Sequence, residues 1–219
     1  MLSSKFAQAA AVMACLAGNL AGEGCRSASG PLLSHRIHHF EAREELRLPA
    51  LIRLGRENGL CFGIEQADNL NQKITLSLAD IDARSAISAI LGSSQDFDIS
   101  VLHKVVLIRD KRLRPPEYLG VRVPRFRIPR STLVSAELNL WMTVEMYLDR
   151  GRKGFAGDGP TGDPTDQVGP FDIREQTVRG LLCRIVENSK GATWISSPIP
   201  SAVAPASINR LWTFVLYAE

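Results

Sequence analysis

Residues 74–91 read ITLSLADIDARSAISAIL, and the pattern of apolar residues changes halfway along this stretch. From Ile74 to Leu78 apolar and polar residues alternate, as they do in a strand with one buried face. After Asp82 the apolar residues follow helical spacing, at Ala86, Ile87, Ile90 and Leu91. An aspartate at this junction suits the N-cap, where its carboxylate accepts a hydrogen bond from a free backbone N–H. The stretch therefore predicts a strand that turns directly into a short helix.

The residues around this unit extend it into the order β-α-β-β-α-β-β. Pro49 fits the first turn of the first helix, where its missing N–H needs no partner, and Gly59 and Gly92 fit the two helix ends. The sequence predicts strands at 35–42, 60–65 and 73–80, helices at 47–58 and 83–91, and a hairpin over 97–108. These elements account for residues 31–112 as one small module.

The second half repeats this plan after a charged linker with a Pro-Pro pair, taken as residues 113–120. A strand is expected at 121–129, and a long helix follows with Ser131 as its cap and Gly151 as its end. Its apolar stripe comprises Leu133, Leu140, Val144, Tyr147 and Leu148.

With an offset of 95 residues, residues 74–91 align with residues 169–186, and Asp82 aligns with Thr177. This is a match of pattern, and any strand-turn-helix unit aligns with another in this way. The prediction is an α+β fold of two small β-α-β-β-α-β-β modules, each with two helices packed on a small mixed sheet. The expected domains are a leader at 1–30, a first module at 31–112 and a second, divergent module at 121–219.

The first half resembles the short periplasmic N-terminal (STN-type) domain of secretins and TonB-dependent receptors over about residues 37–110. The segments that carry the resemblance are LPALIRLGRENGLCFGIE, KITLSLADIDARSAISAIL and FDISVLHKVVLIRD. The resemblance implies a periplasmic domain that makes protein–protein contacts and has no catalytic residues. The second half resembles the family more loosely, and its loop at 156–169 is a departure. We expect no channel or barrel after the second unit, so the family's channel or receptor function is not expected to carry over.

The N-terminal residues have the features of an export signal. One lysine precedes an Ala-rich apolar run that is too short for a transmembrane helix. Three readings remain open, namely ordinary cleavage, lipidation at Cys15, and an amphipathic helix without export. Cys61 and Cys183 lie in different halves and are expected to be buried free thiols, with a disulfide between them as the alternative.

Charge and composition exclude some partners. The net charge is only +3, which does not favour nucleic acid. Basic residues nevertheless cluster at 111–114 and 122–130. These clusters are interpreted as solvated linker residues, with an anionic membrane surface or an acidic protein as the alternative.

Candidate chemistry in the sequence is weak. His35, His38 and His39 lack further ligands at a suitable spacing, and Asp158, Asp163 and Asp166 do not have EF-hand spacing. No serine or threonine has a histidine or lysine at a spacing that would indicate a nucleophile and its general base. We therefore expect no catalytic residue, cofactor or metal, and an enzyme with an unrecognised site remains a third alternative.

The resulting hypothesis is an exported, non-enzymatic protein–protein interaction or signalling adaptor of the bacterial cell envelope. A partner strand would add to an exposed sheet edge, and Val105, Leu107 and Arg109 are the residues predicted to form it. Membrane attachment is expected only if Cys15 is lipidated. The alternative is a module that binds peptidoglycan or another glycan, for which an exposed tryptophan among Trp141, Trp194 and Trp212 is required.

Overall fold

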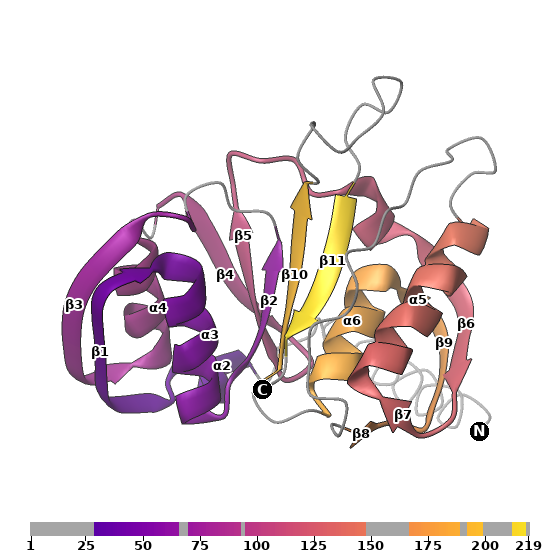
Figure 1. The fold of residues 1–219 in the computed structure, drawn as a ribbon, viewed down its shortest axis with the longest axis horizontal. Coiled ribbons are helices and arrows are strands. Elements are labelled where there is room, and N and C mark those ends of the chain that lie inside the picture. The colour runs from indigo at the N-terminus through magenta and orange to yellow at the C-terminus, as the bar shows by residue number, and fades with distance from the viewer. Residues whose placement is uncertain are drawn as a thin grey trace, which may run out of the picture.

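The computed structural model describes residues 29–65, 70–92, 95–147, 167–188, 192–198 and 212–217. Figure 1 shows five layers that follow one another across the molecule. A two-stranded ribbon of β1 (Arg36–Leu46) and β3 (Lys73–Asp82) covers helices α3 (Arg47–Asn58) and α4 (Ala83–Leu91). A five-stranded sheet lies in the middle. Helices α5 (Leu133–Tyr147) and α6 (Val178–Val186) follow, and a second ribbon of β6 (Arg122–Ile128) and β9 (Phe171–Thr177) covers them.

The capping residue at the start of α4 and the glycines at the ends of α3 and α4 are those that the sequence predicts. Asp82 accepts a hydrogen bond of 2.8 Å from the backbone N–H of Ser85 at the start of α4. Gly59 and Gly92 adopt left-handed conformations after α3 and α4, which favour glycine. At α5 the cap is Thr132 instead of the predicted Ser131, because its Oγ1 accepts the N–H of Ser135 at 3.1 Å.

The central sheet draws its strands from both halves of the chain. Its order is β11 (Trp212–Tyr217), β10 (Thr193–Pro198), β2 (Cys61–Glu65), β5 (Val105–Asp110) and β4 (Phe97–Leu102). The three inner strands β10, β2 and β5 are parallel, and an antiparallel hairpin arm lies at each side. Shorter elements complete the fold: α2 (Ser29–Leu33), the 3-10 helix η1 (Glu117–Gly120), β7 (Ser131–Thr132) and β8 (Gln167–Val168).

Both faces of this sheet are buried, each against its own pair of helices. Phe62 and Ile64 of β2 join the core beneath α3 and α4, whereas Cys61 joins the core beneath α5 and α6. All five residues of β2 are buried, which is the pattern of a strand that is covered on both sides. The β1–β3 ribbon closes the first core, and the β6–β9 ribbon closes the second.

The α+β class is confirmed, and the predicted order of elements in 35–110 matches the structure. The repeat of two modules is not confirmed, because the strands of the two halves form one shared sheet. Strand β10 pairs with β2, so the second half extends the sheet of the first. Of the loop at 156–169, residues 156–166 lie outside the described residues, and Gln167 and Val168 form the short strand β8.

Candidate interaction surfaces

The β1–β3 ribbon leaves a long strand edge without a partner among the described residues. β3 spans ten residues and pairs only with β1. Ala83 donates its N–H to His35 O at 2.8 Å, and such bonded pairs recur every second residue in an antiparallel ladder. The backbone groups of Leu76 and Leu78 therefore point away from β1, while their side chains pack partly against the core. In Figure 1, β3 lies at the left margin of the molecule.

The edges of β4, β6 and β1 carry features that hinder the addition of a strand. On β4, Arg84 donates to Ile99 O at 3.3 Å, and α2 packs beside the strand. β6 contains Pro124 and several arginines, and β1 has a register irregularity between Ala42 and Glu45. Prolines, charges and bulges protect edges in natural sheets. β3 has no proline, and its charged residues Lys73, Asp80 and Asp82 lie near its two ends, where Asp80 also has a positive φ of 52°.

Helix α5 exposes an apolar line on the side opposite its core contacts. Leu138, Met142 and Met146 follow one another at intervals of four residues, and they are 56%, 59% and 69% exposed. The other side of the helix buries Ala136, Leu140 and Val144, among others. The helix is thus apolar around most of its circumference, which is the pattern of a helix that is covered on both sides.

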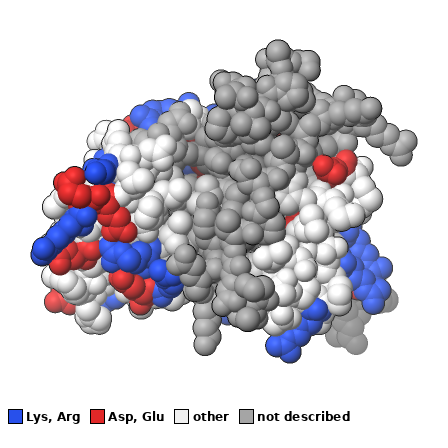
Figure 2. All heavy atoms as spheres, in the orientation of Figure 1, with Lys and Arg blue, Asp and Glu red and all other residues white. Residues whose placement is uncertain are grey.

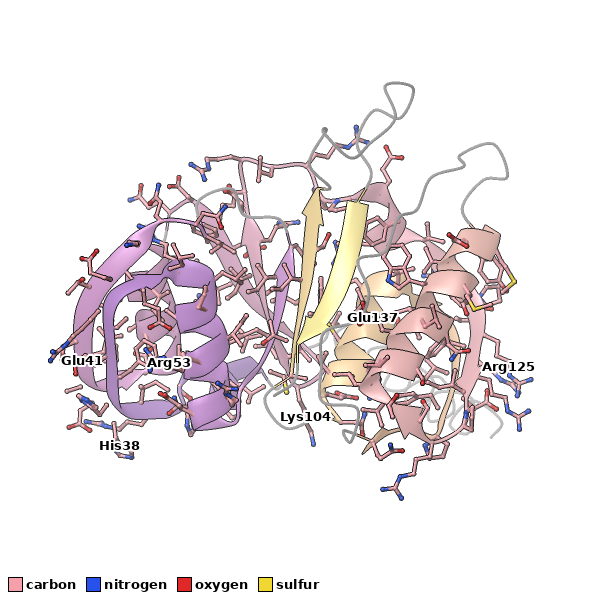
Figure 3. The ribbon with its side chains drawn as sticks, viewed as in Figure 1. His38, Glu41, Arg53, Lys104, Arg125 and Glu137 are labelled. Atoms are coloured by element: carbon pink, nitrogen blue, oxygen red, sulfur yellow. The ribbon has the colours of Figure 1, made fainter. Side chains whose placement is uncertain are left out.

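Beside α5, the outer face of the β6–β9 ribbon is rich in arginine. Arg125 lies directly opposite Arg174 in the ladder, and Arg127 lies opposite Asp172. Asp172 binds Arg125 through two hydrogen bonds of 2.9 and 2.6 Å. The hydrogen bonds from Arg125, with the nearby charges of Arg127 and Arg174, lower the pKa of Asp172. Figure 2 shows basic side chains beside an uncharged surface on this side of the molecule, and Figure 3 shows Arg125 pointing outward.

A row of polar residues crosses the central sheet where its parallel strands end. Glu65 at the end of β2 is 3% exposed. It forms a bidentate ion pair with Arg179 of α6, in which Oε2 lies 2.9 Å from Nη2. Beside it, Tyr118 Oη and Ser196 Oγ lie 2.7 Å apart, and burial raises the pKa of Tyr118. The groups in this row pair with one another, so we interpret the row as a structural link between the two halves.

The structure does not place Val105, Leu107 and Arg109 on a sheet edge, and this part of the prediction is wrong. β5 pairs with β2 on one side and with β4 on the other, so its backbone groups have partners on both sides. Val105 and Leu107 are buried in the core beneath α5 and α6. Arg109 forms an ion pair of 3.0 Å with Asp98 of β4.

The remaining candidate residues fall into three groups. His38 lies on the outer face of the β1–β3 ribbon, 3.3 Å from Asp80 (Figure 3), and no group of three metal-ligating side chains is found in the described ranges. Cys61 and Cys183 are buried free thiols as predicted, and burial raises the pKa of Cys183 to about 12. Asp158, Asp163, Asp166, Cys15, Gly151 and Leu148 lie outside the described residues.

Comparison with known proteins identified no relative. No family model, no curated protein and no solved structure matches the chain. Within the described residues, no helix is both long enough and apolar enough to cross a membrane.

Proposed function

We propose that this chain is an exported, non-enzymatic interaction or signalling adaptor of the cell envelope, and that a partner strand adds to the free edge of β3. The observation that carries the proposal is the edge of β3, which is unpaired within the described structure and has no proline or charged residue between Ile74 and Ala79. A partner strand there would gain backbone hydrogen bonds from Leu76 and Leu78 and side-chain contacts from the exposed residues between them.

Two further observations support this class of function. The order of elements in residues 36–110 is the one expected from the resemblance to STN-type domains, for which protein–protein contact is the implied role. Trp141 is only 7% exposed and Trp194 is fully buried. These two residues therefore offer no stacking surface for a sugar ring, and the glycan-binding alternative receives no support from them.

The decisive experiment blocks the β3 edge without disturbing its pairing with β1. In Leu78→Pro the proline removes an N–H that points outward, whereas Leu78→Ala keeps this donor and removes a similar part of the side-chain packing. We expect the wild type and Leu78→Ala to capture the same partner from a cell-envelope fraction, and Leu78→Pro to lose it. Circular dichroism checks that both variants are folded. Equal capture by Leu78→Pro and Leu78→Ala would show that the partner does not bind at the β3 edge.

Export is tested separately. Mass spectrometry of the protein recovered from the periplasmic fraction identifies its mature N-terminus. We expect a processed chain, and an intact N-terminus in a cytoplasmic fraction would reject the envelope location while leaving the strand-edge test unaffected.

A further inference from the structure

We propose that the exposed face of α5 and the arginine-rich face of the β6–β9 ribbon form one docking surface, and that its occupant is an acidic amphipathic helix of a protein partner. This surface lies across the molecule from the β3 edge (Figure 1), and the inference does not depend on strand addition there.

The apolar part of the surface has the spacing that a packed helix requires. Leu138, Met142 and Met146 form a ridge of the i, i+4, i+8 kind, and such ridges fit the grooves of a second helix. Most of the large apolar side chains that are exposed in the described structure belong to α5. Methionine is flexible and polarisable, and it is common on surfaces that bind apolar helix faces.

The charged part of the surface favours an anionic partner. Arg125 and Arg174 face each other directly across the ladder, and like charges in this position destabilise a sheet. Asp172 pairs with Arg125, while no ion pair of Arg127 or Arg174 is found in the described structure. Carboxylates on a partner would pair with these two arginines and relieve the repulsion.

The pattern fits an acidic helix better than a membrane or a second copy of the chain. A flat anionic bilayer would meet the exposed Glu145 beside the ridge as well as the arginines, whereas a helix can place its carboxylates toward the ribbon alone. A second copy is a poorer match, because α3, α4 and α6 each carry more basic than acidic residues, and α5, whose Glu137 is buried, offers one exposed carboxylate. A partner helix with leucines on one face and glutamates toward the ribbon meets both parts of the surface.

The test uses a synthetic peptide with three copies of Glu-Leu-Ala-Glu-Gln-Leu-Glu, in which leucines share one helical face. We expect binding to the full chain at concentrations on the order of 100 µM or below, measured by fluorescence anisotropy. Met142→Asp and Arg127→Glu should each weaken binding at least about tenfold, because one places a charge on the ridge and the other reverses a cation. The basic analogue, with lysine for each glutamate, should bind at least about tenfold more weakly than the acidic peptide.

Matched controls separate this surface from general effects of charge and apolarity. Leu46→Asp alters an exposed leucine on the other ribbon, and Arg43→Glu reverses an exposed arginine there. Both should change affinity less than about twofold. The inference fails if the acidic peptide does not bind, or if controls and surface variants weaken it equally. It also fails if the chain binds vesicles of phosphatidylglycerol and phosphatidylcholine and Met142→Asp abolishes that binding, because the occupant is then a membrane.

Discussion

Asp82 and Thr177 occupy equivalent positions at the starts of α4 and α6, but only one of them titrates. The carboxylate of Asp82 accepts the N–H of Ser85, and the hydroxyl of Thr177 accepts the N–H of Gly180 at 3.1 Å. The hydrogen bond from Ser85 lowers the pKa of Asp82. A group whose pKa is lower in the folded state stabilises the fold above its unfolded value, about 3.9 for aspartate, and loses this contribution as the pH falls through the folded value.

This difference predicts a pH-dependent effect at one cap and a pH-independent effect at the other. Asp82→Ala and Thr177→Ala should each lower the free energy of unfolding by about 1 kcal/mol near pH 7. Near pH 3 the effect of Asp82→Ala should shrink, whereas the effect of Thr177→Ala should persist. Urea unfolding at the two pH values measures this. The same pH dependence for both variants would contradict the assignment of Asp82 as a charged cap.

At the scale of single elements, Gly63 of β2 leaves space for side chains of the two neighbouring strands, β10 and β5. A Cβ atom at this position would lie 2.6 Å from Leu107 Cδ2 and would also overlap the indole ring of Trp194. Trp194 is fully buried and comes from the second half of the chain. Gly63 thus makes room on the shared sheet for a fully buried tryptophan of the second core.

We therefore expect Gly63→Ala to lower the free energy of unfolding by about 1–3 kcal/mol, which is the usual cost of overpacking a core. Gly120→Ala is the matched control, because no atom lies within 4 Å of a Cβ built there. That variant should be close to neutral. The comparison is made by urea unfolding. Equal stability of the two variants would mean that β2 and β10 are not packed as described.

The elements that the sequence predicts well are those fixed by neighbouring residues. Asp82, Gly59 and Gly92 decide helix ends through contacts within a few residues, so a pattern in the sequence is enough to find them. The partner of β2 is fixed by burial across more than a hundred residues of chain, and no local pattern encodes it. The unbroken apolar run of β2 was nevertheless a sign that both faces of the sheet are covered.

The same distinction applies to the candidate surfaces. The alternation in 97–108 predicts a hairpin correctly, but it does not say which arm is the edge, and the arm with Val105 and Leu107 is the inner one. The α5 ridge was visible in the sequence as Leu138, Met142 and Met146 at spacing four. It was missed because the stripe that includes Leu140 and Val144 already explains the helix as a core element.

At the scale of the whole molecule, the shared sheet joins two cores that face opposite sides. The first core includes Ile64 and Ile108, and the second includes Leu107 and Trp194, all from strands of the same sheet. Each half therefore leaves part of an apolar sheet face exposed if the other half is removed. This arrangement predicts that the described parts of the chain unfold together, because neither core is complete on its own.

The ion pair between Glu65 and Arg179 gives a direct test of this coupling, because one residue comes from each half. Arg179→Met leaves the buried carboxylate of Glu65 without its partner and should lower the free energy of unfolding by about 3–5 kcal/mol. The double variant Glu65→Leu/Arg179→Met replaces both charges with apolar side chains and should regain most of this loss, since a buried pair is often no more stable than a packed apolar one.

Two probes then report on the two halves separately. All three tryptophans lie in the second half, so their fluorescence follows its unfolding, and hydrogen exchange of the α3 and β1 amides follows the first half. We expect Arg179→Met to shift both signals by the same free energy, because the sheet transmits the loss from one core to the other. If the tryptophan signal shifts while exchange in α3 stays unchanged, the halves unfold independently and the shared sheet does not couple them.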